Sequence, residues 1–191
     1  MSAETAEAIV IGASAGAIQA LSRILPALPA DYPVPVLIVV HIPADRSDLL
    51  APLFQAKCRV VVKEAEDKEP ILPGFVYFGA SDYHLLVEAD RTVSLSADEP
   101  VLYSRPSIDV LFESAADAYG DGLVGVILTG ANEDGAEGLQ AVAAAGGMAL
   151  VEDPGTAFAK AMPLAALESC APAQSMSLDA IATYLVGLGA S

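Results

Sequence analysis

The sequence predicts an α/β protein with a doubly wound, mostly parallel sheet flanked by helices and a small antiparallel hairpin excursion. Short β-branched runs alternate with Ala- and Leu-rich stretches over most of the 191 residues, the pattern of strand–helix–strand units. The run at 36–40 is apolar at every position, as in a parallel strand buried on both faces. No Ser/Gly-rich linker or internal repeat interrupts the chain, so we expect a single domain over residues 1–191.

The elements of the first half are separated by small residues and by a helix cap. A turn made only of small residues, Gly-Ala-Ser-Ala-Gly, occupies 12–16. Ser47 is expected to cap a helix whose first turn contains Asp48, where a negative charge is favourable. The expected elements are, in order, a strand at 8–11, a helix at about 17–28, a strand at 36–40, a helix at about 48–56 and a strand at 59–63.

The middle of the chain interrupts the alternation with a hairpin, joined at Ala89-Asp90-Arg91, before strands and helices alternate again. Ser107 and Ser177 are expected to cap two of the later helices. The expected elements are a strand at 75–78, hairpin strands at 85–88 and 92–95, a helix from Ser107 to about 119, a strand at 124–128, a helix at 136–145, a strand at 148–151 and a last helix to about 188.

Composition and charge exclude several classes of protein. The chain is 54% hydrophobic, which excludes a disordered acidic tail. Its 25 acidic and 9 basic residues give a formal charge of −16, so we expect no nucleic-acid partner, because phosphate backbones are bound by clustered Lys and Arg. The two cysteines form no CxxC pair, which argues against a zinc ribbon and a disulfide framework. We predict neither a metal site nor a cofactor.

The termini and apolar runs favour a cytoplasmic protein. The first residues are acidic and lack the cationic region of a secretory signal. No apolar run approaches the roughly 18 residues that a membrane span needs, so we expect no membrane insertion.

Polar residues that follow the predicted strands suggest a catalytic site. Ligands of doubly wound sheets bind outside the carboxyl ends of the strands. Ser14 follows the first strand in a G-x-S-x-G sequence, His41 follows the strand at 36–40, and Asp134 lies in the loop after 124–128. A serine hydroxyl becomes nucleophilic when a base takes its proton and an acid orients that base. We therefore predict Ser14 as nucleophile, His41 as base and Asp134 as orienting acid.

Two other enzyme classes fit the sequence less well. A dinucleotide-binding turn would read G-x-G-x-x-G and be followed by an acid after the second strand, whereas this strand ends in His41. An α/β-hydrolase places its triad in the order Ser, acid, His. Only Asp31 lies between Ser14 and His41, and no histidine follows His84.

Local alternatives stay open for the individual residues. Asp134 competes with Glu133 and Asp109 for the acid's role, and it could instead cap the next helix. His84, the other histidine, is interpreted as a locally hydrogen-bonded loop residue. Arg105 either pairs with a neighbouring acid or holds a substrate carboxylate.

From about residue 9 to 167 the sequence resembles the catalytic domain of the chemotaxis protein-glutamate methylesterases (CheB type). The matching stretches occur in the family's order with similar spacing. They are IGAS at 11–14, VVHIP at 39–43, VKEAED at 62–67, LPG at 72–74, RPSIDVLF at 105–112, GVILTG at 125–130, EDGA at 133–136 and AMP at 161–163.

The resemblance implies hydrolysis of γ-methyl esters on receptor glutamates, and often deamidation of receptor glutamines. The implied partners are methylated cytoplasmic segments of chemoreceptors. It implies the same triad and an oxyanion contribution from the backbone N–H near Ala131; we expect the N–H of Ala15, next to Ser14, to contribute as well. Arg105 and Met162 are the expected substrate-binding residues.

Some positions depart from the family pattern. Ala15 stands where the family usually has threonine, and Leu164 where arginine commonly follows Met-Pro. Only seven residues precede the first predicted strand, so we expect no phosphate-accepting receiver domain in cis and regulation, if any, by a separate protein. These departures keep two alternatives open: an esterase for another acyl substrate, and a non-catalytic binding module that keeps the fold.

Overall fold

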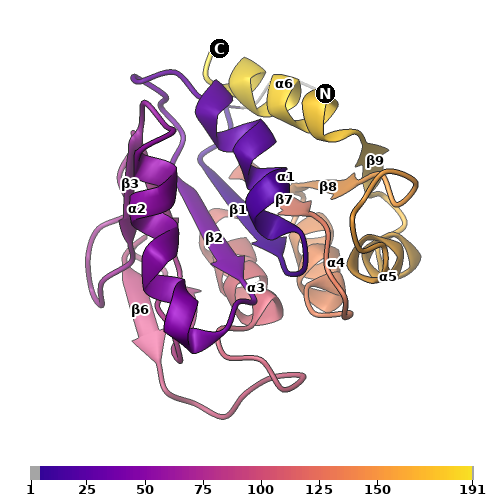
Figure 1. Cartoon of the computed structure of the whole chain (residues 1–191), viewed down its shortest axis with the longest axis horizontal. Coiled ribbons are helices and arrows are strands. Elements are labelled where there is room, and N and C mark those ends of the chain that lie inside the picture. Colours follow the sequence, from indigo (N-terminus) through magenta and orange to yellow (C-terminus); the bar gives the residue numbers. More distant parts are fainter. Residues whose placement is uncertain (1–4, 191) are drawn as a thin grey trace.

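The computed structural model describes residues 5–190 and contains a seven-stranded parallel sheet and a separate antiparallel pair (Figure 1). The order across the main sheet is β3-β4-β2-β1-β7-β8-β9. Its strands are β1 (Ala8–Ala13), β2 (Val36–Val40), β3 (Val61–Glu64), β4 (Phe75–Phe78), β7 (Leu123–Ile127), β8 (Met148–Glu152) and β9 (Gln174–Met176). The pair consists of β5 (His84–Val87) and β6 (Val93–Ser96).

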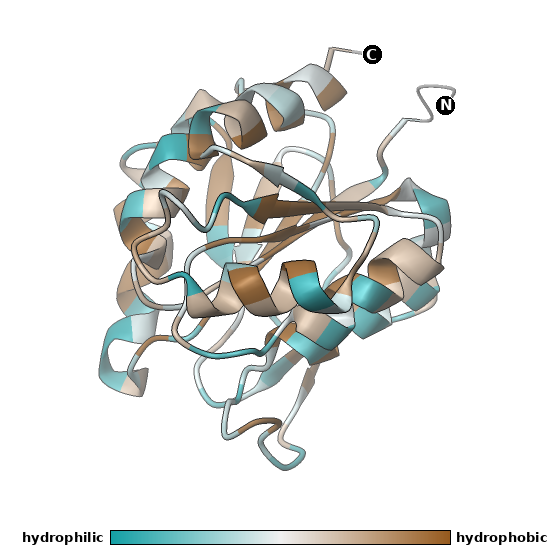
Figure 2. Cartoon of the chain, turned by 90° about the vertical axis from the view of Figure 1, so that its right-hand side faces the viewer, coloured by the Kyte–Doolittle hydropathy of each residue, from teal (hydrophilic) through white to brown (hydrophobic). Residues whose placement is uncertain are grey.

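Helices cover both faces of the sheet. One face carries α1 (Ala17–Ile24), α2 (Leu50–Gln55) and α6 (Leu178–Leu188), and the other carries α3 (Ile108–Tyr119), α4 (Ala136–Ala144) and α5 (Ala161–Ser169). Alternate residues of β1 join the two cores: Ile9 and Ile11 pack on the α1 side, and Ala8 and Val10 on the α3 side. Figure 2 shows the strands as mostly apolar segments between helices that mix apolar and polar residues.

The topology creates a switch point at β1, in the middle of the sheet. The chain builds β2, β4 and β3 on one side of β1 and then returns to build β7, β8 and β9 on the other. Connections therefore leave the carboxyl ends of β1, β2 and β7 in different directions, and a crevice opens at such a point. The predicted doubly wound sheet with a small hairpin is confirmed.

Three features differ from the sequence prediction. Ser47 does not cap a helix: its hydroxyl donates to the Ala44 carbonyl oxygen inside a 3-10 segment, Ala44–Leu49, and α2 begins only at Leu50. The helix expected at 17–28 ends at Ile24 and continues as a 3-10 turn, Leu25–Ala27, since Pro26 cannot donate to the helix. The helix α5 and the strand β9 were not predicted, because Pro163 interrupts the pattern of the first and the second has only three residues.

Ser177 caps α6 as predicted, since its hydroxyl oxygen accepts a hydrogen bond from the N–H of Ala180. Within residues 5–190, no helix has the length and apolar character required to span a bilayer.

Candidate active site

Strand pairing places Ser14 between the residues that follow β2 and β7. On one side the N–H of His41 donates to the Ala13 carbonyl oxygen at 3.0 Å, and on the other the N–H of Ser14 donates to the Thr129 carbonyl oxygen at 2.9 Å. Gly16, at φ +85°, then turns the chain into α1, a conformation that glycine adopts without the penalty of a Cβ. Ser14 and His41, two of the predicted site residues, thus lie side by side at the switch point of the sheet.

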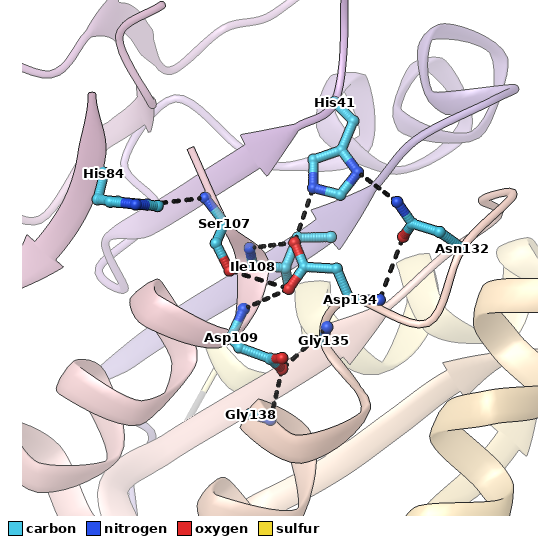
Figure 3. Close-up of polar contacts among 9 residues, drawn as sticks. All are labelled: His41, His84, Ser107, Ile108, Asp109, Asn132, Asp134, Gly135 and Gly138. Atoms are coloured by element: carbon cyan, nitrogen blue, oxygen red, sulfur yellow. Dashed lines mark hydrogen bonds and ion pairs between the residues drawn. The ribbon is translucent and has the colours of Figure 1, made fainter. Parts of the chain in front are cut away.

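His41 and Asp134 form a direct pair, shown in Figure 3. The His41 Nε2 lies 2.7 Å from Asp134 Oδ2, and the side chains are 13% and 0% exposed respectively. Because a carboxylate only accepts hydrogen bonds, this contact assigns the proton to Nε2 and leaves the lone pair on Nδ1. The amide Nδ2 of Asn132 approaches that Nδ1 at 3.5 Å. Nδ1 is therefore the nitrogen of His41 that can accept a proton.

The carboxylate of Asp134 is fixed by the first residues of α3. It accepts hydrogen bonds from the Ser107 hydroxyl at 3.0 Å and from the backbone N–H groups of Ile108 and Asp109 at 2.7 and 3.0 Å. Burial by itself would raise the pKa of Asp134, but the hydrogen bonds from His41, Asp109 and Ile108 outweigh it and hold the pKa below its ordinary value. Asp134 is thus ionised and oriented towards the imidazole.

This arrangement corrects the role expected of Ser107. Its side chain does not cap α3; it donates to Asp134, whose carboxylate takes the place of a local cap at the N-terminus of that helix. Nor is Asp134 the cap of its own helix, since Gly135 occupies that position without a side-chain hydrogen bond.

Asp109, on α3, accepts hydrogen bonds from the start of α4. Its Oδ1 accepts hydrogen bonds from the N–H groups of Gly135 and Gly138 at 2.9 and 2.7 Å. The side chain is only 4% exposed, and burial together with the charge of Asp134 raises its pKa to about 6 against the two hydrogen bonds. The two helices therefore cap each other: Asp134 serves the start of α3, and Asp109 serves the start of α4.

A third buried carboxylate supports the backbone on the other side of Ser14. Glu152, at the end of β8, accepts a hydrogen bond from the N–H of Thr129 at 2.8 Å, and its pKa is raised by burial. The Thr129 hydroxyl in turn donates to the Ala15 carbonyl oxygen at 2.8 Å. These contacts fix the turn that carries Ser14.

Two backbone donors beside the site have no acceptor. Within residues 5–190, the N–H groups of Ala15 and Ala131 form no hydrogen bond. Free N–H groups next to a nucleophile can bind an oxyanion, the role that the sequence predicts for them.

The two expected substrate-binding side chains lie in different surroundings. Arg105 lines a cavity of about 330 Å³ together with His41, but its guanidinium already donates to Asp82 Oδ1 and to the carbonyl oxygens of Ala97 and Asp98. Met162 is 1% exposed and its backbone N–H donates to the Gly130 carbonyl oxygen, so it supports the loop from behind. Contact of either residue with a substrate stays a prediction.

His84 is hydrogen-bonded, but the expectation of a loop residue with local partners is wrong: it is the first residue of β5, is buried, and bonds to residues 15 and 23 positions away. Its Nδ1 accepts a hydrogen bond from the N–H of Ser107 at 3.2 Å, and its Nε2 donates to the Glu99 carbonyl oxygen at 2.9 Å. It supports Ser107, which contacts Asp134 (Figure 3).

The supporting roles of Asp109 and Glu152 were missed by the sequence analysis, although both residues carry a signal. Asp109 lies three positions before Phe112 on the apolar face of a helix, where a charged residue needs a partner. Glu152 directly follows an apolar strand run, at the strand end where functional polar residues gather.

Comparison with known proteins gives consistent results. A model of the family described as CheB methylesterase matches residues 9–185. A putative protein-glutamate methylesterase/protein-glutamine glutaminase of Leptospira interrogans is 48% identical over 182 residues, covering 95% of this chain and 94% of that protein. A protein-glutamate methylesterase/protein-glutamine glutaminase of Cupriavidus pinatubonensis is 42% identical over 85% of this chain, which spans 46% of that longer relative. The crystal structure of the Thermotoga maritima CheB methylesterase catalytic domain is similar with a TM-score of 0.91 and 33% identity, over 95% of this chain and 98% of that one.

Proposed function

Because the chain belongs to the CheB methylesterase family, we propose that it is a serine hydrolase that removes γ-methyl esters from glutamate side chains of chemoreceptors. The observation that carries the proposal is the hydrogen-bonded pair of His41 and Asp134. His41 follows β2 and pairs with the end of β1, where Ser14 lies. Methylated cytoplasmic receptor segments are the substrate, and the enzyme meets them in the cytoplasm. A separate protein regulates it where regulation occurs.

In the first half of the reaction, the Ser14 hydroxyl attacks the ester carbonyl carbon while the Nδ1 of His41 accepts its proton. Asp134, ionised because its pKa is lowered, stabilises the resulting imidazolium through Nε2. The N–H groups of Ala15 and Ala131 bind the oxyanion, an interaction worth about 3–4 kcal/mol per donor. His41 then gives its proton to the leaving methoxide, which departs as methanol.

In the second half, water attacks the acyl-enzyme. His41 takes a proton from the water and returns it to the Ser14 oxygen as the acyl bond breaks, so that glutamate and free enzyme result. A glutamine side chain can follow the same path with ammonia as the leaving group, in line with the double name of the relatives.

The test is methanol release from methylated receptor fragments. Ser14→Ala removes the nucleophile and should lower the rate by about 10⁴-fold or more. Ser22→Ala is the matched control, since Ser22 lies on α1, outside the site, and accepts a hydrogen bond from Lys57. Undiminished methanol release by Ser14→Ala would overturn the assignment.

A fluorophosphonate probe separates the remaining alternatives. Labelling of Ser14 together with hydrolysis of simple esters but not of receptor fragments would indicate an esterase for another acyl substrate. No labelling with an intact His41 would indicate a non-catalytic binding module.

A further inference from the structure

The segment between β6 and α3 projects from the molecule at the edge where the strands of the main sheet end (Figure 1). Within it, residues 101–104 close a tight turn, in which the backbone N–H groups of Val101 and Ser104 each donate to the other residue's carbonyl oxygen at 3.0 and 2.9 Å. The two central residues, Leu102 and Tyr103, have φ angles of 48° and 64°. Glycine or asparagine is usual in this left-handed region. The turn thus presents two large side chains where a small residue would be less strained, and such strain points to a functional position.

Tyr103 lines the same cavity as His41, the proposed catalytic base. It borders the cavity of about 330 Å³ that His41, Ile42 and Arg105 also line. Its side chain is fully exposed, and across the described part of the chain it forms no hydrogen bond, ion pair or ring contact with another residue. Nothing in the fold accounts for an aromatic ring here.

The base of the turn that carries Tyr103 is held in place by Arg105. Arg105 donates to the carbonyl oxygens of Ala97 and Asp98 and to Asp82, which closes the base of the loop. Leu102 lines a separate cavity, which Ala136 of α4 and Ala165 of α5 also line. Tyr103 therefore extends from a fixed backbone, and a ring with two side-chain torsions loses little entropy when it binds.

We infer that Tyr103 is a specificity-determining residue, whose ring packs against an apolar side chain of the substrate polypeptide next to the glutamyl ester. The inference rests on the proposed function. The molecule that contacts the ring is the substrate itself, because Tyr103 and His41 line the same cavity. Charge supports an apolar contact, because each ester removed leaves a carboxylate on the substrate segment, which a chain of net charge −16 repels. Attraction between the substrate segment and the surface around the His41 cavity must then come from contacts that do not depend on charge. An exposed aromatic ring supplies such a contact.

The test compares Tyr103→Ala with wild type on two substrates, a methylated receptor fragment and N-acetylglutamate γ-methyl ester. On the fragment, kcat/KM should fall about 10-fold, mainly through KM, as for an aromatic anchor at an interface. On the small ester, which is too short to reach the ring, it should stay within about twofold of wild type. Tyr103→Phe, which keeps the ring, should match wild type on both.

Leu72→Ala is the matched control, since Leu72 is also an exposed apolar side chain but precedes β4, at the opposite end of the sheet. Thermal unfolding should be the same in all variants, because Tyr103 packs on no part of the fold. An equal loss on both substrates, or no loss on the fragment, overturns the inference. Wild-type protein that releases no methanol from the fragment overturns the proposed function, and this inference with it.

Discussion

Asp109 and Asp134 lie side by side at the start of α3, yet the pKa values of their carboxyl groups shift in opposite directions. Asp134 accepts two hydrogen bonds from α3 and one from Ser107, which precedes the helix, and it contacts His41, so its pKa is lowered. Asp109 accepts two backbone N–H groups, but burial and the neighbouring charge raise its pKa to about 6. When the surroundings separate the pKa values of two adjacent carboxyl groups, the group with the higher pKa takes up the first proton. Asp109 is the member that protonates first as the pH falls, and Asp134 stays ionised, as its proposed role requires.

The raised pKa of Asp109 has a consequence for stability. Between its ordinary value of 3.8 and its value of about 6 in the fold, the folded protein binds this proton more readily than the unfolded chain does. The free energy of unfolding therefore falls as the pH rises through this window. Asp134 acts in the opposite sense, because its lowered pKa adds stability that is lost in acid as the group protonates in the fold.

Asp109→Asn should accordingly stabilise the protein at neutral pH. An asparagine oxygen can accept the same two hydrogen bonds without placing a charge beside Asp134. At pH 7.5 we expect a gain of about 1–3 kcal/mol, measured as a higher Tm, which disappears towards pH 4. Asp117→Asn removes an equal charge from an exposed position of the same helix and should leave the Tm nearly unchanged. A lower Tm for Asp109→Asn at pH 7.5 would show that the charge itself stabilises the fold.

At the scale of elements, the start of α3 is positioned by β1 as well as by α4. A Cβ on Gly12 of β1 would lie 2.4 Å from Ile108 Cγ2, closer than real contacts allow. Ile108 is the first residue of α3, and its N–H donates to Asp134. The absence of a side chain at position 12 therefore lets α3 approach the sheet closely enough to hold Asp134, the proposed catalytic acid.

Gly12→Ala should reduce both stability and activity. Overpacking at this contact is expected to cost about 1–3 kcal/mol, and a shift of Ile108 would loosen its hydrogen bond to Asp134. Both effects can be measured, by thermal unfolding and by methanol release. The double variant Gly12→Ala/Ile108→Ala should be more stable than the sum of the two single changes predicts, because the smaller side chain relieves the clash.

The control for this prediction is Gly187→Ala in α6, where an added Cβ meets no atom within 4 Å. In a helix, alanine is favoured over glycine, so this variant should be as stable as wild type or more so. If the effects of Gly12→Ala and Ile108→Ala on the free energy of unfolding simply add, the proposed clash between these two positions is wrong.

The same elements show how far a sequence can predict this fold and site. The strand β2 was predicted from Val36 to Val40 because burial on both faces leaves an unbroken apolar run. The residues that follow the strands, Ser14 and His41, could be located because parallel strands end at one edge of the sheet. The mutual capping of α3 and α4 could not be predicted, since Asp134 serves a helix that begins 26 residues before it in the chain.

At the scale of the whole molecule, the net charge of −16 is only partly balanced at the surface. Several of the few cations are already paired with acids: Arg23 with Asp179, Lys63 with Glu69, and Arg105 with Asp82. The guanidinium of Arg105, which lines the same cavity as His41, is thus neutralised locally. Each ester that the enzyme removes leaves a new carboxylate on the substrate, so repulsion grows as the reaction proceeds and favours release of the product.

This charge predicts an unusual salt dependence. Raising the salt concentration from 10 to 100 mM shortens the screening length from about 30 to about 10 Å, which weakens the repulsion between enzyme and an acidic receptor fragment. We expect kcat/KM on the fragment to rise roughly threefold or more, while kcat/KM on a neutral small ester should not change. A fragment in which the neighbouring glutamates are replaced by glutamine should lose the dependence. A fall with salt on the acidic fragment would instead mean that a local positive surface at the crevice outweighs the charge of the whole molecule.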